Sequence, residues 1–577
     1  MKAARTKPQT PSIHYTVSMP DPTSHTFHVD VHAHGVGSSP VLAFPVWTPG
    51  SYKLREFGKN VSGFAVKGGQ HELLDKQRYA VAGAKGGEFR ASFRVYADEL
   101  SVRTPHLDET HGFFLGTNLL PFLEGSTEGL PAACVYDITI QPWRNWQVAT
   151  SLPSAGKNTW RAAHYDILGD TPFEIGTHKV RSFKVRGVRH DVAFYGYGNF
   201  DAARIVADTA KVVGAQAKLF GGLPYDRYLF IHHITPDSGG GLEHLNSCVC
   251  GWNSWKFKEE EDYQAFIRLV SHEFFHAWNV KRTRPAVLGP FNYSREQYTR
   301  ALWVMEGLTQ YYERIWCARA GVTKPERVLR SFAENIERED RRPGRKVMSL
   351  EDASWLAWTK LYLADEDYVN TGVSYYSRGA QVGLLLDAKI RALTGGARNL
   401  DHVMKLAFQR FGWPKPGFAE RGFEALCEEV AGQKLTRFWR DHVQGTRELK
   451  YDEFLDVYGL EFHRENDKPK PWLGLTLSGN RVSAVFADGP GRKAGLQARD
   501  EIIAVNSNRT EGKALDDRLA ELPTGKPASL AVFRRQRLVQ AEITPQPEPA
   551  SALQLRQVKK PTAAQKRNFK SWLGVRI

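Results

Sequence analysis

The sequence predicts a multidomain α+β protein with a β-rich first part, a mainly helical middle and a β-rich C-terminal part. The chain has 577 residues, which is too long for one hydrophobic core at about 150 residues per domain. Apolar residues alternate with polar ones in the first part and recur at helical spacing in the middle. A charged, proline-rich stretch, HRENDKPKP at 463–471, reads as a linker. These breaks predict domains at 1–185, 186–462 and 472–548, followed by a basic C-terminal tail at 549–577.

The first 185 residues are expected to form a sandwich-like β domain. Phe27, Val29, Val31 and Ala33 alternate with polar residues, and short runs of this kind recur between turn signals such as Thr48–Ser51. One face of the resulting sheet is therefore expected to pack on a core.

The opposite face of that first strand carries the polar residues His28, Asp30, His32 and His34. Same-face neighbours on a strand lie about 6–7 Å apart, which is wide for ligands of one metal ion. We therefore interpret this face as a solvated strand surface and not as a metal site.

The middle part changes to helical spacing after about residue 186. The short apolar run Tyr228–Ile231 predicts a strand there, and the glycine-rich loop Ser238–His244 follows it. From about 258 to 445 the pattern is mostly helical. Beyond the linker, a compact β-rich segment is expected to about residue 548.

Composition favours a globular protein of a reducing compartment, and we expect a cytoplasmic one. Five cysteines are too few for a disulfide framework, and Cys248 and Cys250 have no second pair with which to form a cysteine zinc site. No signal peptide and no run of about 18 apolar residues is present, so we expect no membrane span. The net charge of +15 is concentrated partly in the tail, which we read as a solvated basic surface and not as a nucleic-acid partner site.

The stretch SHEFFHAW, residues 271–278, predicts a metal site on a helix. His272 and His276 lie four residues apart, so their imidazoles stack on one helix face and can bind a single ion. Glu273 lies beside that face and can reach a bound water molecule.

Glu306 is the predicted third metal ligand. It lies 30 residues after His276 (306 − 276), a gap that allows one connection and half of a second, antiparallel helix. We expect that helix to begin at a capping box formed by Ser294 and Gln297 and to end at Gly321.

Several motifs together resemble the glycyl aminopeptidase family of gluzincin zinc metallopeptidases, whose members carry a PDZ domain. The match includes HEFFHAWNVKRTRP and WVMEGLTQYY, and it extends over nearly the whole chain. The further matching motifs are FPVWTPGSYKLREF (44–57), YDILGDTPFEIG (165–176), SGGGLEH (238–244) and SYYSRG (374–379).

The resemblance implies a thermolysin-like catalytic domain that binds one zinc ion per chain through His272, His276 and Glu306, with Glu273 as the catalytic base. It also implies an aminopeptidase whose substrates are peptides with a free N-terminus and small first residues such as glycine and alanine. Zinc acidifies water toward a pKa of about 7, which suits attack on a carbonyl with Glu273 as proton acceptor.

Two further roles are implied by a resemblance to aminopeptidase N-like gluzincins. Tyr376 resembles a tyrosine in a Tyr-x-Lys-Gly setting that stabilises the oxyanion, although Arg378 replaces the lysine here. Tyr375 is the alternative, because adjacent helix residues point about 100° apart. Glu243, which follows Gly240 and Gly241, resembles the glutamate that binds the substrate amine, with His244 in place of an asparagine.

The segment 472–548 resembles a PDZ domain, which binds the C-terminal end of a peptide by adding it as a strand. Leu473–Leu475 lies in the carboxylate-binding loop by this resemblance, and Arg499 departs from the usual glycine. The chain's own terminus, Val575–Ile577, has the alternating pattern that such a groove binds. Packing of Phe569, Trp572 and Leu573 against the catalytic domain is the competing interpretation.

Two other functions remain open at this point. A thermolysin-like endopeptidase would use the same metal site without a preference for a free N-terminus. A PDZ adaptor with a weakly active site would use the C-terminal domain alone.

Overall fold

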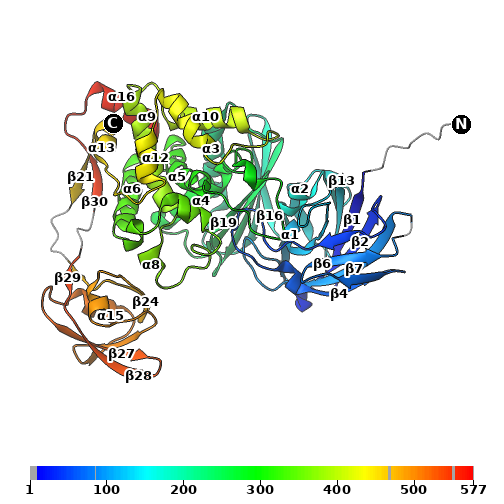
Figure 1. Cartoon of the computed structure of the whole chain (residues 1–577), viewed down its shortest axis with the longest axis horizontal. Helices are drawn as coiled ribbons and strands as arrows, with labels where there is room; N and C mark the ends of the chain where they lie inside the picture. The colour runs from blue at the N-terminus through cyan, green and yellow to red at the C-terminus, as the bar shows by residue number, and fades with distance from the viewer. Residues whose placement is uncertain (1–9, 85, 465–469, 549–552, 576–577) are drawn as a thin grey trace. The chain divides into compact units, whose positions relative to one another are not determined.

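In the computed structural model, residues 10–84, 86–464, 470–548 and 553–575 are described, and they form two compact units. Unit 1 consists of Met1–Thr299, Tyr312–Val322 and Lys405–Glu420. Unit 2 consists of Arg300–Tyr311, Thr323–Met404 and Arg421–Ile577. The elements of both are labelled in Figure 1.

Unit 1 begins with three β-sheets. The largest has the strand order β13-β14-β11-β1-β2-β7-β4, and the smaller two have the orders β10-β3-β6-β5 and β12-β15-β9-β8. The strands of the largest sheet are β1 (Ser12–Ser18), β2 (Thr26–His34), β4 (Val61–Val66), β7 (Glu88–Tyr96), β11 (Val135–Gln141), β13 (Ser154–Gly156) and β14 (Thr159–Ala162). Those of the smaller sheets are β3 (Val41–Ala43), β5 (Gln70–Leu73), β6 (Arg78–Ala82), β8 (His106–Leu107), β9 (His111–Leu115), β10 (Phe122–Leu123), β12 (Gln147–Thr150) and β15 (Pro172–Gly176).

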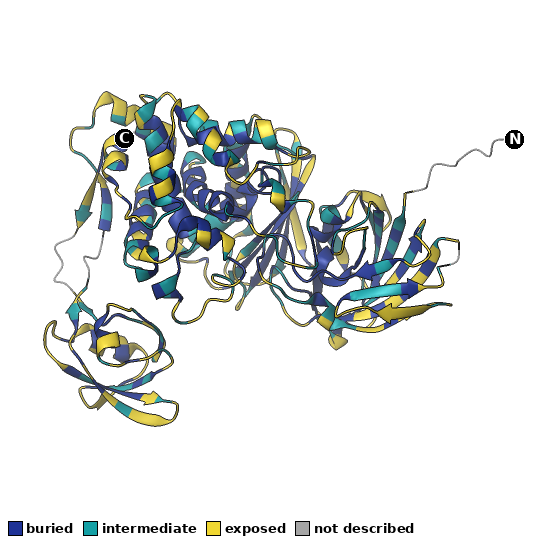
Figure 2. Cartoon of the chain, viewed as in Figure 1, coloured by how far each residue is buried: buried dark blue, intermediate teal, exposed yellow. Residues whose placement is uncertain are grey.

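The alternation predicted for the first domain is confirmed on β2. Phe27, Val29, Val31 and Ala33 are buried in one core with residues of all three sheets, and the residues between them are exposed or half-buried. Figure 2 shows this difference as dark inner faces and lighter outer faces. The short helices α1 (Gly116–Leu119) and α2 (Tyr165–Gly169) pack at this core.

A five-stranded sheet follows in unit 1 and supports the helices that carry the candidate site. Its order is β16-β17-β18-β20-β19; β17, β18 and β20 are parallel, and β19 is an antiparallel edge strand. The strands are β16 (Lys179–Val185), β17 (Val188–Gly196), β18 (Arg227–Thr235), β19 (Gly241–His244) and β20 (Ser247–Asn253). The predicted strand at Tyr228–Ile231 is thus confirmed. The predicted domain boundary at 185/186 falls in the turn between β16 and β17, which pair with each other.

Two long helices pack on this sheet through a shared apolar core. Asp201 caps α3 (Ala202–Phe220) by accepting hydrogen bonds from the backbone N–H groups of Ala203 and Arg204. The second helix, α4 (Glu260–Phe275), begins with three acidic residues, which favour its N-terminal dipole. Buried residues of both helices and of β18 form one cluster, so the end of α4 is held firmly against the sheet.

Unit 2 contains most of the remaining helices, as predicted for the middle of the chain. They are α6 (Pro325–Asp340), α7 (Leu350–Trp355), α8 (Tyr368–Thr371), α9 (Ser377–Leu393), α11 (Gly422–Ala431), α12 (Thr436–His442) and α13 (Asp452–Tyr458). Two helices, α5 (Leu308–Arg319) and α10 (Leu400–Phe411), begin in unit 2 and end in unit 1.

The helix that carries Glu306 does not begin where the sequence predicted. Ser294 lies in a turn and Gln297 in the irregular segment after it, where Gln297 donates hydrogen bonds to the carbonyls of Val287 and Pro290. The helical run instead starts with the π-helical turn η4 (Trp303–Gly307) and continues into α5. The capping-box prediction was wrong because the Gln297 side chain bonds to carbonyls of its own loop, and the buried Ser294 Oγ has no hydrogen-bond partner in the described part of the chain.

The C-terminal part of unit 2 is β-rich, as expected. Its main sheet has the order β23-β24-β25-β27-β28, with β26 paired to β25, and its core is separate from those of unit 1. The elements are β22 (Pro471–Trp472), β23 (Leu475–Ser478), β24 (Arg481–Val485), α14 (Pro490–Lys493), β25 (Glu501–Val505), β26 (Asn508–Arg509), α15 (Lys513–Ala520), β27 (Ala528–Arg534), β28 (Arg537–Ile543) and β29 (Gln546–Pro547).

The last described residues are not the solvated tail that their charge suggested. The strand β30 (Leu553–Gln557) pairs with β21 (Leu460–Arg464), and the helix α16 (Ala563–Leu573) packs against α13. Trp572 is fully buried and donates a hydrogen bond to the hydroxyl of Tyr311. Burial of one apolar helix face overrides the surface charge, which confirms the packing interpretation. The proposed insertion of the chain end depends on Ile577, which lies outside the described residues.

None of the helices in the described ranges is both long enough and apolar enough to span a membrane.

Candidate functional site

The end of α4 presents His272 and His276 to one side. His272 lies in the last turn, and His276 follows the helix in a helical backbone conformation. The spacing therefore works as predicted: the two ring centroids are 4.8 Å apart, with the ring planes nearly perpendicular. Both side chains are buried, with exposed fractions of 8% and 1%.

Each imidazole is fixed through its Nδ1 atom. His272 Nδ1 donates a hydrogen bond to Oε2 of Glu313 over 2.7 Å, and His276 Nδ1 donates to the backbone carbonyl of Asn279 over 2.7 Å. These bonds assign the proton to Nδ1 in both rings, so Nε2 is the electron-pair donor in each ring. Metal-binding histidines in proteins typically donate the N–H of the other ring nitrogen to a carboxylate or a backbone carbonyl in this way.

Glu313 is a residue of the candidate site that the sequence analysis missed. It lies on α5 seven residues after Glu306, or about two helical turns, and this spacing was the available signal. Burial opposes ionisation of Glu313, but Arg314 and the hydrogen bond from His272 outweigh it and hold the pKa of this carboxyl below its ordinary value. A charged Glu313 makes the His272 imidazole a better electron donor.

Glu273 and Glu243 lie together next to His276. One carboxylate oxygen from each and one ring nitrogen of His276 all lie within 4.8 Å of one another, and all three residues are buried. The glycine loop approaches Glu273 closely: a Cβ on Gly241 would lie 2.1 Å from the Oε1 atom of Glu273. A side chain at Gly241 would therefore displace the Glu273 carboxylate. Gly240 has a φ of +79°, which also favours glycine.

Glu243 stands on the edge strand β19 and is held from two sides. A Cβ on Gly50, in the TPGSY motif, would lie 2.7 Å from the Glu243 carboxylate. On the other side Lys281 Nζ is 3.8 Å from Glu243 Oε1 and only 2.7 Å from Asp170. Lys281 thus pairs mainly with Asp170, which leaves the Glu243 carboxylate able to bind another cation. Neither Lys281 nor Asp170 was identified from the sequence.

A small cavity of about 20 Å³ lies beside Glu243. This is room for about one water-sized group. Its walls include aromatic and aliphatic side chains and the TPGSY loop. The lining residues are Trp47, Pro49, Gly50, Tyr52, Glu243, Val280, Lys281, Arg284, Leu288 and Phe291.

The other predicted residues, Glu306 and Tyr376, belong to unit 2. Glu306 is buried in η4, a π-helical turn of the kind that is frequent at functional sites. Gly307 and Gly379 let η4 and α9 touch, since a Cβ on Gly307 would lie 2.6 Å from Cα of Gly379. Burial and the charge of Glu306 raise the pKa of Tyr376 well above 10, so its hydroxyl stays a proton donor. Tyr375 stacks on Tyr376 and is fully buried.

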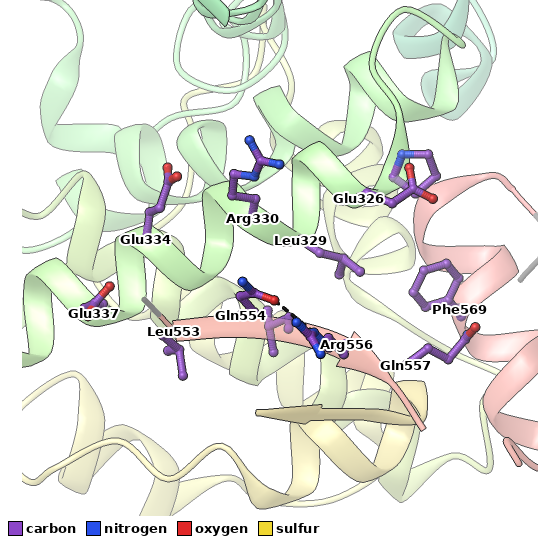
Figure 3. Close-up of a pocket in the computed structure, with 12 residues that line it drawn as sticks. Glu326, Leu329, Arg330, Glu334, Glu337, Leu553, Gln554, Arg556, Gln557 and Phe569 are labelled. Atoms are coloured by element: carbon purple, nitrogen blue, oxygen red, sulfur yellow. Dashed lines mark hydrogen bonds between the residues drawn. The ribbon is translucent and has the colours of Figure 1, made fainter. Parts of the chain in front are cut away.

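A larger cleft in unit 2 is lined by none of the described residues predicted for the site. It measures about 630 Å³ and lies between α6 and β30, with Phe569 of α16 at one end (Figure 3). Its walls carry acidic and basic side chains without a cluster of metal ligands among the residues shown.

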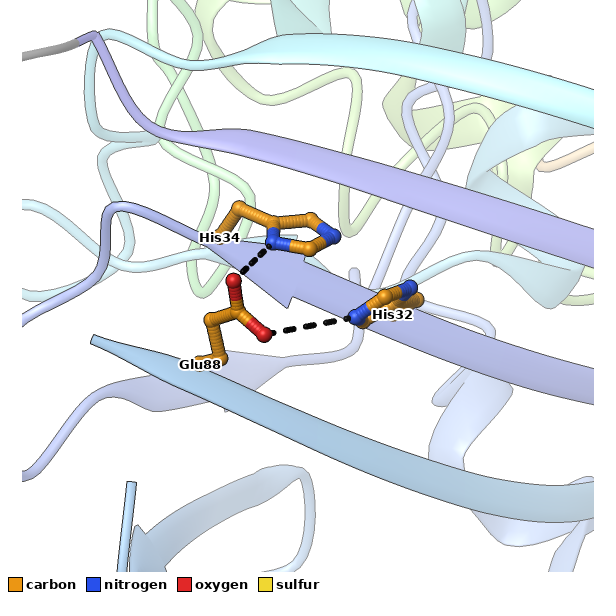
Figure 4. A group of neighbouring side chains, drawn as sticks. All are labelled: His32, His34 and Glu88. Carbon is orange, nitrogen blue, oxygen red and sulfur yellow. Dashed lines mark hydrogen bonds and ion pairs between the residues drawn. The ribbon is translucent and has the colours of Figure 1, made fainter. Parts of the chain in front are cut away.

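The strand histidines rejected as a metal site do come close together. His32 and His34 have ring centroids 3.8 Å apart, and Glu88 accepts a hydrogen bond from His34 over 2.8 Å (Figure 4). The rings lean toward each other and so shorten the spacing expected from the backbone. The side chains remain open to solvent, with 28%, 41% and 56% of their areas exposed in the order His32, His34 and Glu88.

Comparisons with known proteins agree with the motifs. The family described as M61 glycyl aminopeptidase matches residues 265–382, and the peptidase M61 N-terminal domain matches residues 14–177. The crystal structure of an aminopeptidase N family protein from Idiomarina loihiensis is similar, with a TM-score of 0.90 and 29% identity over 97% of this chain and 100% of that chain.

Two more distant structures are also similar in part. An M1 zinc metallopeptidase from Deinococcus radiodurans has a TM-score of 0.47 and 14% identity, over 77% of this chain and 95% of that chain. Yeast LTA4 hydrolase in complex with bestatin has a TM-score of 0.48 and 14% identity, over 76% of this chain and 68% of that chain. No curated protein matches the sequence significantly.

Proposed function

Because the chain carries both domains of the M61 glycyl aminopeptidase family, we propose that it is a zinc-dependent aminopeptidase that hydrolyses the first peptide bond of its substrates. The observation that carries this proposal is the state of the two helix histidines. Both donate from Nδ1 to buried acceptors, so in each ring Nε2 is the atom with the lone pair that a metal ion would bind.

The proposed zinc ligands are His272, His276 and Glu306. Two neutral imidazoles and one carboxylate are the donor set of a catalytic zinc site, which keeps a fourth position open. Glu306 lies about two helical turns before Glu313 on the helical run of η4 and α5. When bound, zinc supplies Lewis-acid polarisation of the scissile carbonyl and acidifies water.

Glu273 is the proposed general base. Its carboxylate is buried and close to His276. The glycine loop packs closely against it, since a Cβ on Gly241 would lie 2.1 Å from Glu273 Oε1. It accepts the proton of the attacking water and delivers it to the leaving amine. Tyr376 donates a hydrogen bond to the oxyanion that forms when the carbonyl oxygen takes up negative charge, a role that its raised pKa supports.

Glu243 is the proposed anchor for the substrate's α-ammonium group, with Gly240 and Gly241 leaving space for the peptide backbone. A charge-assisted pair at this position restricts cleavage to the first bond. The nearby cavity of about 20 Å³ supports a preference for glycine and alanine as the first residue.

The C-terminal β part is proposed to act as a PDZ domain that binds the C-terminal end of a peptide or partner. Its strand β23 is at the edge of the sheet, where a peptide strand can be added. Gly474 has a φ of +66° and lies against Gly489, in the loop that resembles a carboxylate-binding loop. We also propose a cytoplasmic location, which the five free, buried cysteines support.

The test combines metal analysis with activity on two kinds of substrate. We expect one zinc ion at the α4 site, and activity on aminoacyl reporters that chelators abolish and zinc restores. Equal cleavage of N-blocked and free-amine peptides would indicate an endopeptidase instead. Peptide binding to the C-terminal domain without any hydrolysis would indicate a PDZ adaptor.

A further inference from the structure

Unit 1 contains a second group of histidines, away from α4, that the proposed peptidase chemistry does not use. It consists of His111 on β9, Glu174 on β15, His178 just after β15, and His233 on β18. We call it the buried histidine cluster. All four side chains are buried, with exposed fractions of 0%, 0%, 4% and 1% in that order.

The strand register explains why these side chains converge. On the paired strands β9 and β15, His111 lies opposite Gly176 and Phe113 lies opposite Glu174, so His111 and Glu174 are diagonal neighbours on one face. Gly176 leaves room for the imidazole, since a Cβ there would lie 2.9 Å from Cβ of His111. His233 reaches the same place from a different sheet.

Several donor atoms of the cluster lie within reach of one ion. His233 Nε2 is 2.9 Å from Glu174 Oε2, and His178 Nδ1 is 3.9 Å from Glu174 Oε1. One ligand atom each from His111, Glu174 and His233 lies within 4.8 Å of the others. Zinc bonds of about 2.0–2.2 Å place tetrahedral donors roughly 3.4 Å apart, so small side-chain shifts suffice.

The cluster also has buried polar atoms without hydrogen-bond partners in the described part of the chain. They are His111 Nε2, Glu174 Oε1, His233 Nδ1 and both ring nitrogens of His178. Unpaired buried polar atoms are costly, and native structures seldom keep several in one place. A cation surrounded by these atoms would satisfy most of them at once.

The surroundings of His111 match those of a metal ligand. Its Nδ1 atom lies 3.8 Å from the carboxylate of Asp108, and its Nε2 atom is buried without a hydrogen-bond partner among the described residues. A carboxylate behind the ring fixes the tautomer and the orientation of a ligating histidine. Tyr195 stacks on the ring of His111, with centroids 3.4 Å apart, and covers it.

We propose that the buried histidine cluster is a second divalent-metal site that binds zinc through His111, Glu174 and His233, with His178 as the fourth ligand. Imidazole and carboxylate donors favour zinc over magnesium or calcium, and four protein ligands are typical of a structural site. The ligands come from the sheet containing β9 and β15 and from the sheet containing β18. The ion therefore joins the first part of unit 1 to the sheet that supports α4.

The test uses the full-length chain with the α4 site disabled by His272→Gln and His276→Gln, so that it does not depend on the proposed function. After equilibration with zinc and removal of loosely bound ions by a weak chelator, we expect about two zinc ions in the wild type and about one in this double variant. Adding His233→Gln should lower the content to near zero.

His232→Gln in the same background is the matched control. His232 is the strand neighbour of His233 and is equally buried, but it lies outside the cluster and contacts Phe194 and Phe266. This control should keep about one ion. Circular dichroism checks that every variant folds.

Two further measurements test the proposal if the His233 variant does not fold. Cobalt bound to the double variant should give the intense visible absorption of a four-coordinate N/O site, and zinc should raise its Tm. A double variant that binds no ion and shows no change in Tm with zinc would overturn the proposal. So would a folded triple variant that still retains one ion.

Discussion

Two pairs of histidines in this protein have rings almost in contact, and they differ in what holds them. His272 and His276 lie at the end of α4 with ring centroids 4.8 Å apart, and His32 and His34 lie on β2 at 3.8 Å. Distance alone would favour the strand pair as a metal site.

The difference lies in burial and in the partners of the second ring nitrogen. The helix pair is buried, and its Nδ1 atoms bind the buried carboxylate of Glu313 and a backbone carbonyl. The strand pair is half exposed, and both of its rings face the exposed carboxylate of Glu88. A metal site therefore needs donors that are fixed and shielded from water, in addition to donors that are near each other. The predictions below test this comparison.

The largest effect is expected from Glu273→Gln. The variant keeps the histidines and their partners but loses the proton acceptor, so kcat/KM should fall by about 10²–10⁴-fold. Zinc content measured in parallel should stay at the wild-type value. Near-normal turnover would show that Glu273 is not the base.

The next effect is expected at Tyr376. Replacement of Tyr376 by Phe removes one oxyanion donor and should lower kcat by about 10²–10³-fold with little change in zinc content. Tyr375→Phe is the matched control and should be milder. If the control shows the larger loss, Tyr375 is the donor.

A selective effect is expected from Glu243→Gln, which preserves the side-chain size against Gly50. Loss of the charged partner should weaken cleavage of free-amine substrates by about 10–100-fold, since hydrogen bonds to charged groups contribute more than neutral ones. N-blocked peptides serve as the comparison. An equal loss on both substrate types contradicts the amine-anchor role.

The comparison itself is tested by Glu313→Ala. This change leaves both of the proposed zinc-binding nitrogens in place but removes the partner of His272, so zinc affinity should fall by about 10–100-fold. Glu313→Gln keeps a hydrogen-bond acceptor without the charge, so its zinc affinity should lie between those of the wild type and of Glu313→Ala. The exposed Glu259, changed to Gln, is the control, and equal zinc affinity in all four proteins would refute the role of Glu313.

The smallest effect is expected when His32 and His34 are both changed to Gln. Surface substitutions of this kind usually change stability by less than about 0.5 kcal/mol. Activity and chelator-resistant metal content should therefore remain unchanged. A loss of tightly bound metal in this variant would reverse the comparison between the two pairs.

The sequence by itself determined the features that depend on local periodicity. The positions of His272, Glu273 and His276 at one helix end follow from a spacing of four residues, and the buried face of β2 follows from strict alternation. The sequence also indicated that Gly241 lets another group lie close to the backbone. Such features depend on residues within one or two turns, and backbone geometry fixes them.

Only the tertiary structure decided which distant residues complete each site. Glu313 is 41 residues from its partner His272, Gly50 meets Glu243 across nearly 200 positions (243 − 50), and His233 meets Glu174 from another sheet. The charged C-terminal segment was misread for the same reason, since Trp572 is buried by helices far earlier in the chain. Burial and pairing are properties of the packed core, and a local pattern does not encode which long-range contact will satisfy a given side chain.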